Sequence, residues 1–243
     1  MECTIKAIFF DIDDTVYSTT NFAENARRSS VRAMINAGLK IDEETCYQEL
    51  LEVINEFPKN YSQHFDKLLL RLPQPAIADM NPSLIVAAGI VAYHDTKFRQ
   101  LLPYEDCIEV LKILKNTDLK LGIITSGLAI KQSEKIIRLG LNKFIDNRLV
   151  FISDQMGISK QNIKIFQMAC SHAEVGPHQT IYVGDNAAVD VDYPNQAGMI
   201  TILSKRGGKY LSVESATNPH HVIQNFWDLL EILTGVYHLP IQY

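Results

Sequence analysis

Several features that mark large classes of protein are missing from this sequence. No run of about 18 apolar residues occurs, although a helix needs that length to cross a bilayer. The N-terminus enters an apolar, strand-like run almost at once and lacks the basic start and small-residue cleavage site of a secretory signal. There is no internal repeat and no low-complexity tract. We therefore expect a globular, cytoplasmic protein that does not bind membranes.

Basic residues and paired cysteines are also scarce. The formal net charge is −5 and no stripe of Lys and Arg is present. This argues against a nucleic-acid partner, because nucleic-acid binders need a basic surface to neutralise phosphates. The cysteines, with no C-x-x-C pair and no His at zinc-ligand spacing, are Cys3, Cys46, Cys107 and Cys170. We expect them to be reduced, partly buried thiols.

What the sequence does contain is a series of short apolar runs. The chain has 243 residues, of which 47% are apolar and 21% charged, so a packed core is expected. Continuous apolar runs of four to eight residues are typical of strands buried on both faces. The runs cover residues 7–10, 121–124, 149–152, 181–184 and 199–203.

Helical patterns lie between these runs. Strands that alternate with helices indicate parallel βαβ units, so the predicted fold is a doubly wound, Rossmann-like α/β sheet. Ligands in such sheets bind beyond the carboxyl ends of the strands. In the helix after the second run, the face expected to be buried carries Ile130, Ile136, Ile137 and Leu139. The helical patterns cover residues 108–114, 130–139, 163–169 and 226–233.

An all-helical insert follows the first predicted strand. Prolines punctuate this part of the chain, and it shows little strand pattern. We predict a core domain of residues 1–16 and 102–243 with an inserted helical-bundle domain of residues 17–101. Because the insert leaves and rejoins the chain beside the first strand, it could act as a lid. Its predicted helices cover residues 23–37, 43–56, 63–70 and 83–93.

The strongest chemical signal is a pair of carboxylates at the end of the first strand. Asp11 and Asp13 are two residues apart and must lie close together. Close like charges raise a pKa unless a cation intervenes, and Mg²⁺ takes oxygen ligands of this kind. One carboxylate can attack phosphorus while another serves as general acid and then base. Taken alone, the same pattern also fits a turn or a helix N-cap.

Polar residues follow three later parts of the predicted core. Thr125-Ser126-Gly127 follow the second strand and offer a hydroxyl and backbone N–H groups at a helix start, which suits phosphate binding. Lys160 precedes another helix. Asp185 follows the fourth strand directly after a glycine, with Asp190 five residues later. Each signal is weak alone, because caps and surface charges are common.

Together these residues resemble the haloacid dehalogenase-like hydrolase superfamily, whose pattern is D-x-D-x-T, then Ser or Thr, then Lys, then G-D-x-x-x-x-D. The resemblance implies that Asp11 is the nucleophile and a Mg²⁺ ligand. Asp13 would protonate the leaving group and then activate water, with its backbone carbonyl on the metal. The other implied roles are phosphoryl binding by Thr125 and Lys160, metal binding by Asp185, and orientation of the metal shell or of Lys160 by Asp190.

The resemblance extends to one branch of the superfamily. Residues 93–98 and 121–127 resemble archaeal-type glyceraldehyde-3-phosphate phosphatases with a helical C1 cap. This implies a small phosphorylated metabolite as substrate, such as glyceraldehyde 3-phosphate. One departure is Gln161, which stands where the family usually has Pro after its lysine. Lys164 lies nearby and is an alternative to Lys160 for that role.

Other functions remain open at this point. The core motifs also fit a phosphomutase, which would return the phosphoryl group to a sugar. A dehalogenase is disfavoured because those enzymes typically carry Tyr at the position of Asp13. A receiver-like signalling domain shares the acidic cluster but is about half as long. An inactive phosphate-binding regulatory protein is the remaining alternative. The sequence leaves open whether the protein is a monomer or a homodimer.

Overall fold

The computed structural model of the protein describes residues 4–57, 61–78 and 80–241. The chain divides into two compact units, Met1–Thr20 with Leu102–Tyr243 and, between them in sequence, Asn21–Leu101. The first unit thus continues beyond residue 16, where the domain boundary was predicted. The reason is that Thr19 and Thr20 hydrogen-bond back to the chain just after the first strand.

The first unit contains a parallel sheet, as predicted. Its described residues form a sheet of six strands in the order β3-β2-β1-β4-β5-β6. The sixth strand was not predicted, because it is short and lacks a continuous apolar run. The strands are β1 (Ala7–Phe10), β2 (Lys120–Thr125), β3 (Val150–Ile152), β4 (Thr180–Gly184), β5 (Ile200–Ser204) and β6 (His221–Ile223).

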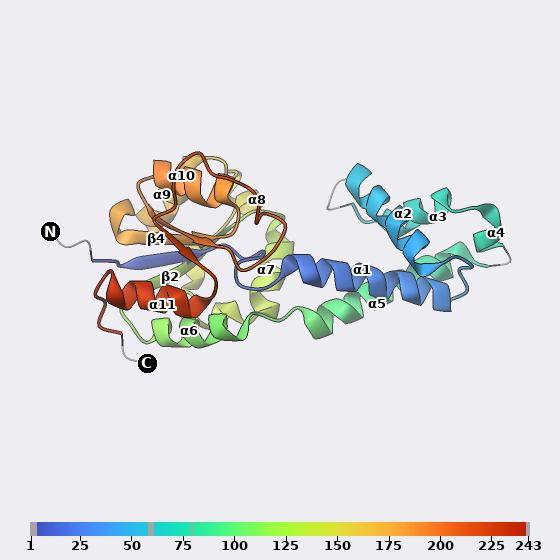
Figure 1. Ribbon diagram of the computed structural model, residues 1–243, viewed down its shortest axis with the longest axis horizontal. Coiled ribbons are helices and arrows are strands. Elements are labelled where there is room, and N and C mark those ends of the chain that lie inside the picture. Colours follow the sequence, from blue (N-terminus) through green and yellow to red (C-terminus); the bar gives the residue numbers. More distant parts are fainter. Residues whose placement is uncertain (1–3, 58–60, 79, 242–243) are drawn as a thin grey trace. The chain divides into compact units, whose positions relative to one another are not determined.

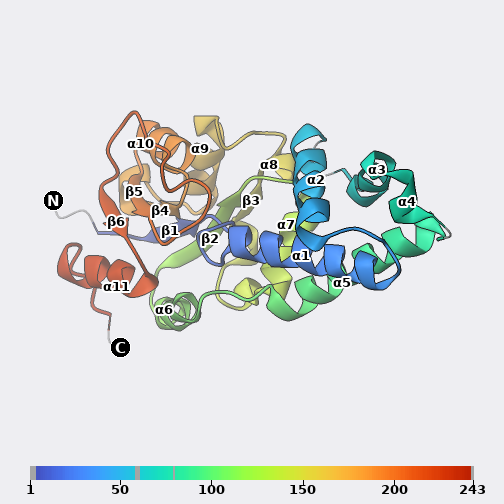
Figure 2. The same ribbon diagram turned by 45° about the vertical axis from the view of Figure 1, so that its right-hand side comes forward.

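Helices cover both faces of this sheet. Figure 1 shows α9 and α10 on one face and α6 and α11 on the opposite face, and Figure 2 agrees. The predicted α/β doubly wound fold is therefore confirmed. The helices are α6 (Glu105–Lys115), α7 (Ala129–Arg138), α8 (Ser153–Met156), α9 (Ile163–His172), α10 (Asp192–Gln196) and α11 (Phe226–Gly235). The short 3₁₀ segments are η1 (Leu141–Lys143), η2 (Asn147–Leu149) and η3 (Pro177–Gln179), and η4 (Ala187–Val191) is a π-helix.

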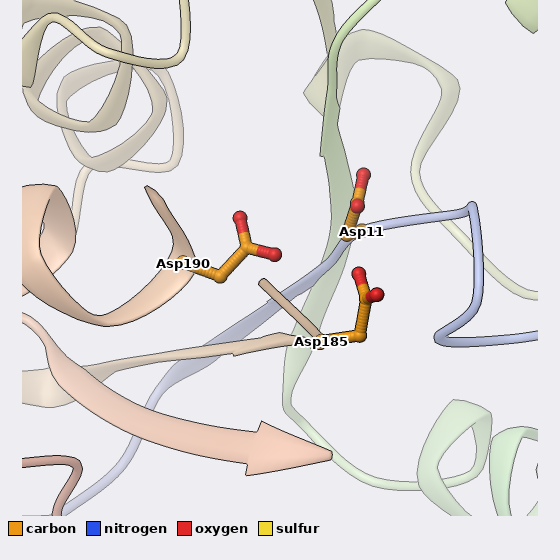
Figure 3. Close-up of side chains that lie close together, drawn as sticks. All are labelled: Asp11, Asp185 and Asp190. Carbon is orange, nitrogen blue, oxygen red and sulfur yellow. The ribbon is translucent and has the colours of Figure 1, made fainter. Parts of the chain in front are cut away.

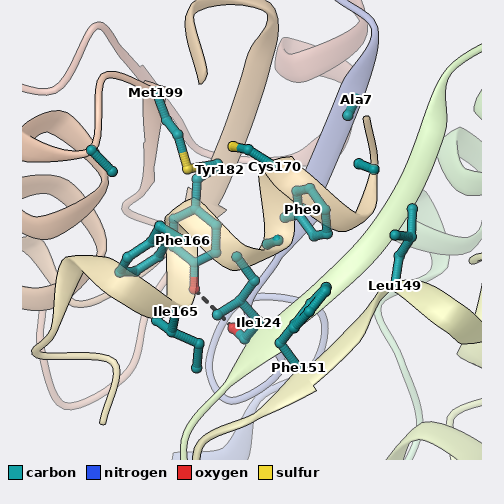
Figure 4. Packing of buried hydrophobic residues seen from close by; sticks show 13 residues of the cluster. Ala7, Phe9, Ile124, Leu149, Phe151, Ile165, Phe166, Cys170, Tyr182 and Met199 are labelled. Atoms are coloured by element: carbon teal, nitrogen blue, oxygen red, sulfur yellow. Dashed lines mark hydrogen bonds between the residues drawn. The ribbon is translucent and has the colours of Figure 1, made fainter. Parts of the chain in front are cut away.

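Two neighbouring phenylalanines of β1 fix the strand between the two helical layers. Successive side chains of a strand point to opposite faces. Phe9 packs edge-on against Phe151, with ring centroids 6.0 Å apart, in the cluster beneath α9. Phe10 stacks on Phe226 of α11 at 5.9 Å. Figure 4 shows the first cluster, where the Tyr182 hydroxyl donates a hydrogen bond to a backbone carbonyl of β2. The central strand therefore cannot shift without exposing one of the two cores.

One helix face differs from its prediction. Ile130 and Ile137 of α7 are 79% and 63% exposed, so the prediction that they are buried is wrong. The inward positions are instead Gln132, Ile136 and Leu139, which follow the spacing of a helical face. A polar side chain can occupy that face because the Gln132 amide donates hydrogen bonds there.

The second unit consists of helices and turns in its described residues. Its core is an apolar cluster that includes Met34, Leu50 and Leu68. The last helix runs further than predicted because residues 94–100 are mostly polar and break the apolar period, while the helix continues to just before Pro103. The helices are α1 (Thr19–Asn36), α2 (Glu43–Glu56), α3 (His64–Arg71), α4 (Gln74–Ile77) and α5 (Pro82–Gln100).

The described cysteines are reduced and buried. Cys46, Cys107 and Cys170 are buried free thiols, and Cys3 lies outside the described residues. No helix in the described part of the chain is both long and apolar enough to span a membrane.

A partly buried ion pair holds the segment after β5 against α6. Arg206 donates to Asp106 of α6 at 2.6 Å, and the backbone N–H of Phe226 donates to the same carboxylate at 2.8 Å. Burial would raise the pKa of Asp106, but these two donors lower it below its usual value. The carboxylate is therefore ionised and connects three segments of the first unit.

Replacing Asp106 by Asn should lower the free energy of unfolding by about 1–3 kcal/mol at neutral pH, because it removes a charged hydrogen-bond acceptor from a largely buried site. Glu134→Gln, which breaks the more exposed Arg138–Glu134 pair of α7, should cost about 0.5 kcal/mol or less. Since folding lowers the pKa of Asp106, the difference between wild type and Asp106→Asn should shrink as the pH falls below about 4. Urea unfolding at several pH values measures both effects, and equal losses in the two variants would contradict the prediction.

Candidate active site

Three buried carboxylates meet at the carboxyl edge of the sheet. Asp11 follows β1 and Asp185 follows the neighbouring β4, while Asp190 comes from η4. One carboxylate oxygen from each residue lies within 4.8 Å of one oxygen from each of the others, and Figure 3 shows the three side chains close together. The register explains this, because the backbone N–H of Asp11 still donates to the Val183 carbonyl oxygen at 2.9 Å. The two strands therefore end side by side, and Asp11 and Asp185, which follow them, lie at the same place.

A glycine makes room for the third carboxylate. A Cβ atom on Gly184 would lie 2.4 Å from Asp190 Oδ2, which is closer than any real contact. The Asp190 carboxylate also accepts hydrogen bonds from the Asn186 backbone N–H at 3.0 Å and from the Tyr182 hydroxyl at 3.4 Å. The glycine before Asp185 is thus required by the approach of Asp190 rather than by backbone conformation.

One buried lysine joins two of these acids. Lys160 Nζ lies 2.7 Å from Asp190 Oδ1 and 3.2 Å from Asp11 Oδ1. Burial would lower the pKa of Lys160, but the two carboxylates raise it above its usual value, so the ammonium stays charged. Lys164 is exposed on α9 instead. The geometry thus brings Lys160, and not Lys164, into the site.

A single ammonium does not balance three buried carboxylates. Burial raises the pKa of Asp11 to about 6, with Lys160 lowering it only in part. Burial, and next the charge of Asp11, raise the pKa of Asp185 to about 8. Within the described residues Asp185 Oδ2 accepts no hydrogen bond. Carboxylates that repel one another and keep an unsatisfied oxygen fit a hard divalent cation, which takes oxygen ligands.

The turn after β2 adds polar groups from the other neighbour of β1. Thr125 is buried, and its hydroxyl has no hydrogen-bond partner among the residues described. The Gly127 N–H donates to Ser153 Oγ at 3.1 Å, and the Ser126 carbonyl accepts from a side chain of α7. Because β2 ends at Thr125 and α7 begins at Ala129, Ser126 and Gly127 belong to the turn before the helix rather than to its first turn. The buried Thr125 hydroxyl is therefore available for a ligand.

Asp13 lies in a different environment from Asp11. In the described part of the chain its carboxylate accepts from Tyr17 Oη at 2.6 Å, Thr19 Oγ1 at 2.7 Å and Gln132 Nε2 at 3.3 Å. Lys135 Nζ contacts both oxygens, Oδ1 at 2.6 Å and Oδ2 at 2.7 Å. Burial alone would raise the pKa of Asp13, but Lys135 and the hydroxyl donors lower it. This carboxylate is held as an anion by side chains that the sequence analysis did not single out.

A sequence signal for two of these partners exists. Gln132 and Lys135 are three residues apart on α7 and share a helix face. Gln132 also falls in the helical series of the buried positions Ile136 and Leu139, where an apolar residue would be expected. A polar residue at a core position of the helix after Thr125 points to a hydrogen-bonding task in the site.

The family model of the haloacid dehalogenase-like hydrolases matches residues 5–198, a segment that includes every site residue predicted above. The chain belongs to this family. The resemblance inferred from the motifs is therefore confirmed, and the receiver-like alternative is wrong.

Known relatives of this hydrolase match it over nearly its full length. The glyceraldehyde 3-phosphate phosphatase of Methanopyrus kandleri is 46% identical over 234 residues, covering 94% of this chain and 97% of its own. The enzyme of the same name from Methanocaldococcus jannaschii is 38% identical and covers 96% and 98%. Among solved structures, a HAD phosphatase from Thermococcus onnurineus superposes with a TM-score of 0.66 at 23% identity, over 95% of this chain and 99% of its own. That likeness shows the fold.

Magnesium should raise the midpoint of thermal unfolding, because a cation at the acid cluster relieves repulsion in the folded state only. At a concentration of 100 times Kd the stabilisation is about 2.7 kcal/mol. Asp185→Asn should remove most of this shift by removing a charged ligand. Asp118→Asn, at an exposed position on the same unit, should keep it. Differential scanning calorimetry with and without Mg²⁺ measures the shift, and an unchanged response in Asp185→Asn would place the cation elsewhere.

Proposed function

We propose that this protein is a Mg²⁺-dependent phosphatase that hydrolyses a small phosphate monoester through an aspartyl-phosphate intermediate, with glyceraldehyde 3-phosphate as the first candidate substrate. The observation that carries the proposal is the position of Asp11, which belongs to the acid cluster, lies 3.2 Å from Lys160 Nζ and follows the strand that pairs with the one ending at Thr125. The names of the full-length relatives support both the reaction and the candidate substrate.

In the first step a carboxylate oxygen of Asp11 attacks phosphorus, and the bond from phosphorus to the ester oxygen breaks. The Lys160 ammonium and the Thr125 hydroxyl, both buried, are suited to hold the oxygens of the transferring group. A Mg²⁺ ion held by Asp11, Asp185 and the backbone carbonyl of Asp13 would neutralise charge on that group. Asp190 keeps Lys160 in place through its 2.7 Å ion pair.

Asp13 serves both steps in this proposal. Asp13 is an anion in the free protein, so it takes up one proton from solvent when the substrate binds and gives that proton to the leaving alkoxide in the first step. In the second step it takes a proton from water, whose oxygen attacks phosphorus and breaks the bond to Asp11. Inorganic phosphate leaves, and Asp11 and Asp13 return to their starting forms.

Two alternative functions would give different products. A phosphomutase would return the phosphoryl group to an organic acceptor, so it would release little inorganic phosphate. An inactive phosphate-binding protein would release none. The core residues recognise phosphate and metal alone, so another part of the chain must select the leaving group. That the helical unit does this as a lid stays a prediction.

With Mg²⁺ present, the wild-type protein should release inorganic phosphate and glyceraldehyde from glyceraldehyde 3-phosphate faster than from bulkier sugar phosphates. Asp11→Asn should lower kcat by about a thousandfold or more, because the amide is a poor nucleophile and removes a ligand charge. A phosphate-release assay across a panel of phosphorylated metabolites measures both. Turnover in Asp11→Asn within tenfold of wild type would contradict the covalent mechanism.

Asp13→Asn should affect substrates according to their leaving groups. An alkoxide needs a proton in the first step, whereas 4-nitrophenolate leaves without one. We expect kcat for an alkyl phosphate to fall by about a hundredfold or more. With 4-nitrophenyl phosphate the variant should show a fast burst of phenolate followed by slow turnover, because hydrolysis of the intermediate still needs a base. Rapid-mixing absorbance measurements give both phases, and loss of the burst would exclude Asp13 as the leaving-group acid.

A further inference from the structure

We propose that Lys135 is a positioning residue that sets the orientation of the Asp13 carboxylate, an inference that rests on the proposed role of Asp13. Its ammonium contacts both carboxylate oxygens, at 2.6 and 2.7 Å. The two side chains are 19% and 31% exposed, so the pair is largely shielded from water. The motif lysine has a separate task, since Lys160 pairs with Asp11 and Asp190 instead.

The other donors cannot fix the carboxylate alone. Tyr17 and Thr19 both donate to Oδ1 and come from the same short segment as Asp13 itself. They would move together with Asp13 if this segment shifted. Gln132 reaches Oδ2, but at 3.3 Å. Lys135 is therefore the close contact that ties the second oxygen to a separate, rigid element, the helix α7.

That helix also contacts the turn that follows Thr125. Gln132 donates to the Ser126 carbonyl at 2.8 Å and to Asp13 Oδ2, so one side chain of α7 touches both parts of the site. Lys135 lies three residues further on the same face. The two residues together hold Asp13 at a fixed distance from the turn after β2, where the phosphoryl group is proposed to bind.

A fixed distance matters for proton transfer. A general acid must come within about 2.6–3.2 Å of the atom that it protonates. A displacement of about 1 Å can cost about a hundredfold in rate. Because an ammonium has three donors and no acceptor, Lys135 can hold both oxygens at once and can only donate to them. Its effect on the reaction should therefore pass through Asp13 alone.

The test is a double-mutant cycle with Lys135→Met and Asp13→Asn, measured in the full chain with Mg²⁺. For an alkyl phosphate, Lys135→Met should lower kcat by about 10- to 100-fold and change KM by less than about threefold. The phenolate burst with 4-nitrophenyl phosphate should stay within about threefold of wild type. In the Asp13→Asn background the same substitution should change kcat by less than about twofold, because its target is already lost.

Two further variants control the interpretation. Lys112→Met, at an exposed position on α6, should behave as wild type. Lys135→Arg keeps two donors for one carboxylate and should recover most of the alkyl phosphate activity lost in Lys135→Met. If Lys135→Met does not fold, as judged by circular dichroism, Lys135→Gln takes its place in the same cycle.

The outcomes separate this inference from the proposed function. If Lys135→Met lowers the rate of the phenolate burst as much as kcat for the alkyl phosphate, or if its losses add to those of Asp13→Asn, Lys135 has a general structural role and the inference alone is overturned. A Lys135→Met variant with wild-type kcat would do the same. If Asp13→Asn itself shows no dependence on the leaving group, the proposed role of Asp13 fails and the positioning role fails with it.

Discussion

The core of this protein is organised around an excess of buried negative charge at one edge of a parallel sheet. Asp11, Asp185 and Asp190 approach within 4.8 Å, and Lys160 is the buried cation that joins two of them. Buried carboxylates are tolerated only when they are paired, hydrogen-bonded or bound to a metal. The protein alone therefore neutralises only part of the negative charge of these carboxylates. The site has fewer positive than negative groups, so the folded protein gains stability when a cation and a phosphate bind there together.

The order of the strands determines where these charged side chains lie. Because β1 lies between β2 and β4, its carboxyl end has a neighbouring strand on each side. Phe9 and Phe10 anchor the strand to opposite helical layers, so Asp11 leaves a part of the molecule that cannot easily move. Thr125 arrives from one neighbour and Asp185 from the other. The packing of Phe9 and Phe10, which do not take part in the reaction, thus helps to determine the distance between the proposed nucleophile and the groups around it.

The parts of the fold that could be predicted are those governed by local pattern. β1 to β5 are continuous apolar runs, and the acids at their ends followed from the parallel arrangement. β6 carries His221 and the exposed Val222, so it gives no such signal. The partners of Asp13 could not be predicted in the same way, because Lys135 acts through a contact with a residue 122 positions away. Which face of α7 turns toward β1 is decided by tertiary packing, as the exposed Ile130 shows.

The two carboxylates of the first motif show how one short segment can supply two kinds of acid. Asp11 is the last group of a buried strand, and burial raises its pKa to about 6 in the absence of a cation. Asp13 lies two residues on, where the chain has left the sheet, and Lys135 with Tyr17 lowers its pKa against the effect of burial. Groups whose environments push their pKa values apart are suited to different tasks. A cation that lowers the pKa of Asp11 would leave the contacts of Asp13 in place. The nucleophile can therefore depend on the metal for its charge. Asp13, an anion in the free protein, depends on protein contacts for its position and takes up a proton before it acts as an acid.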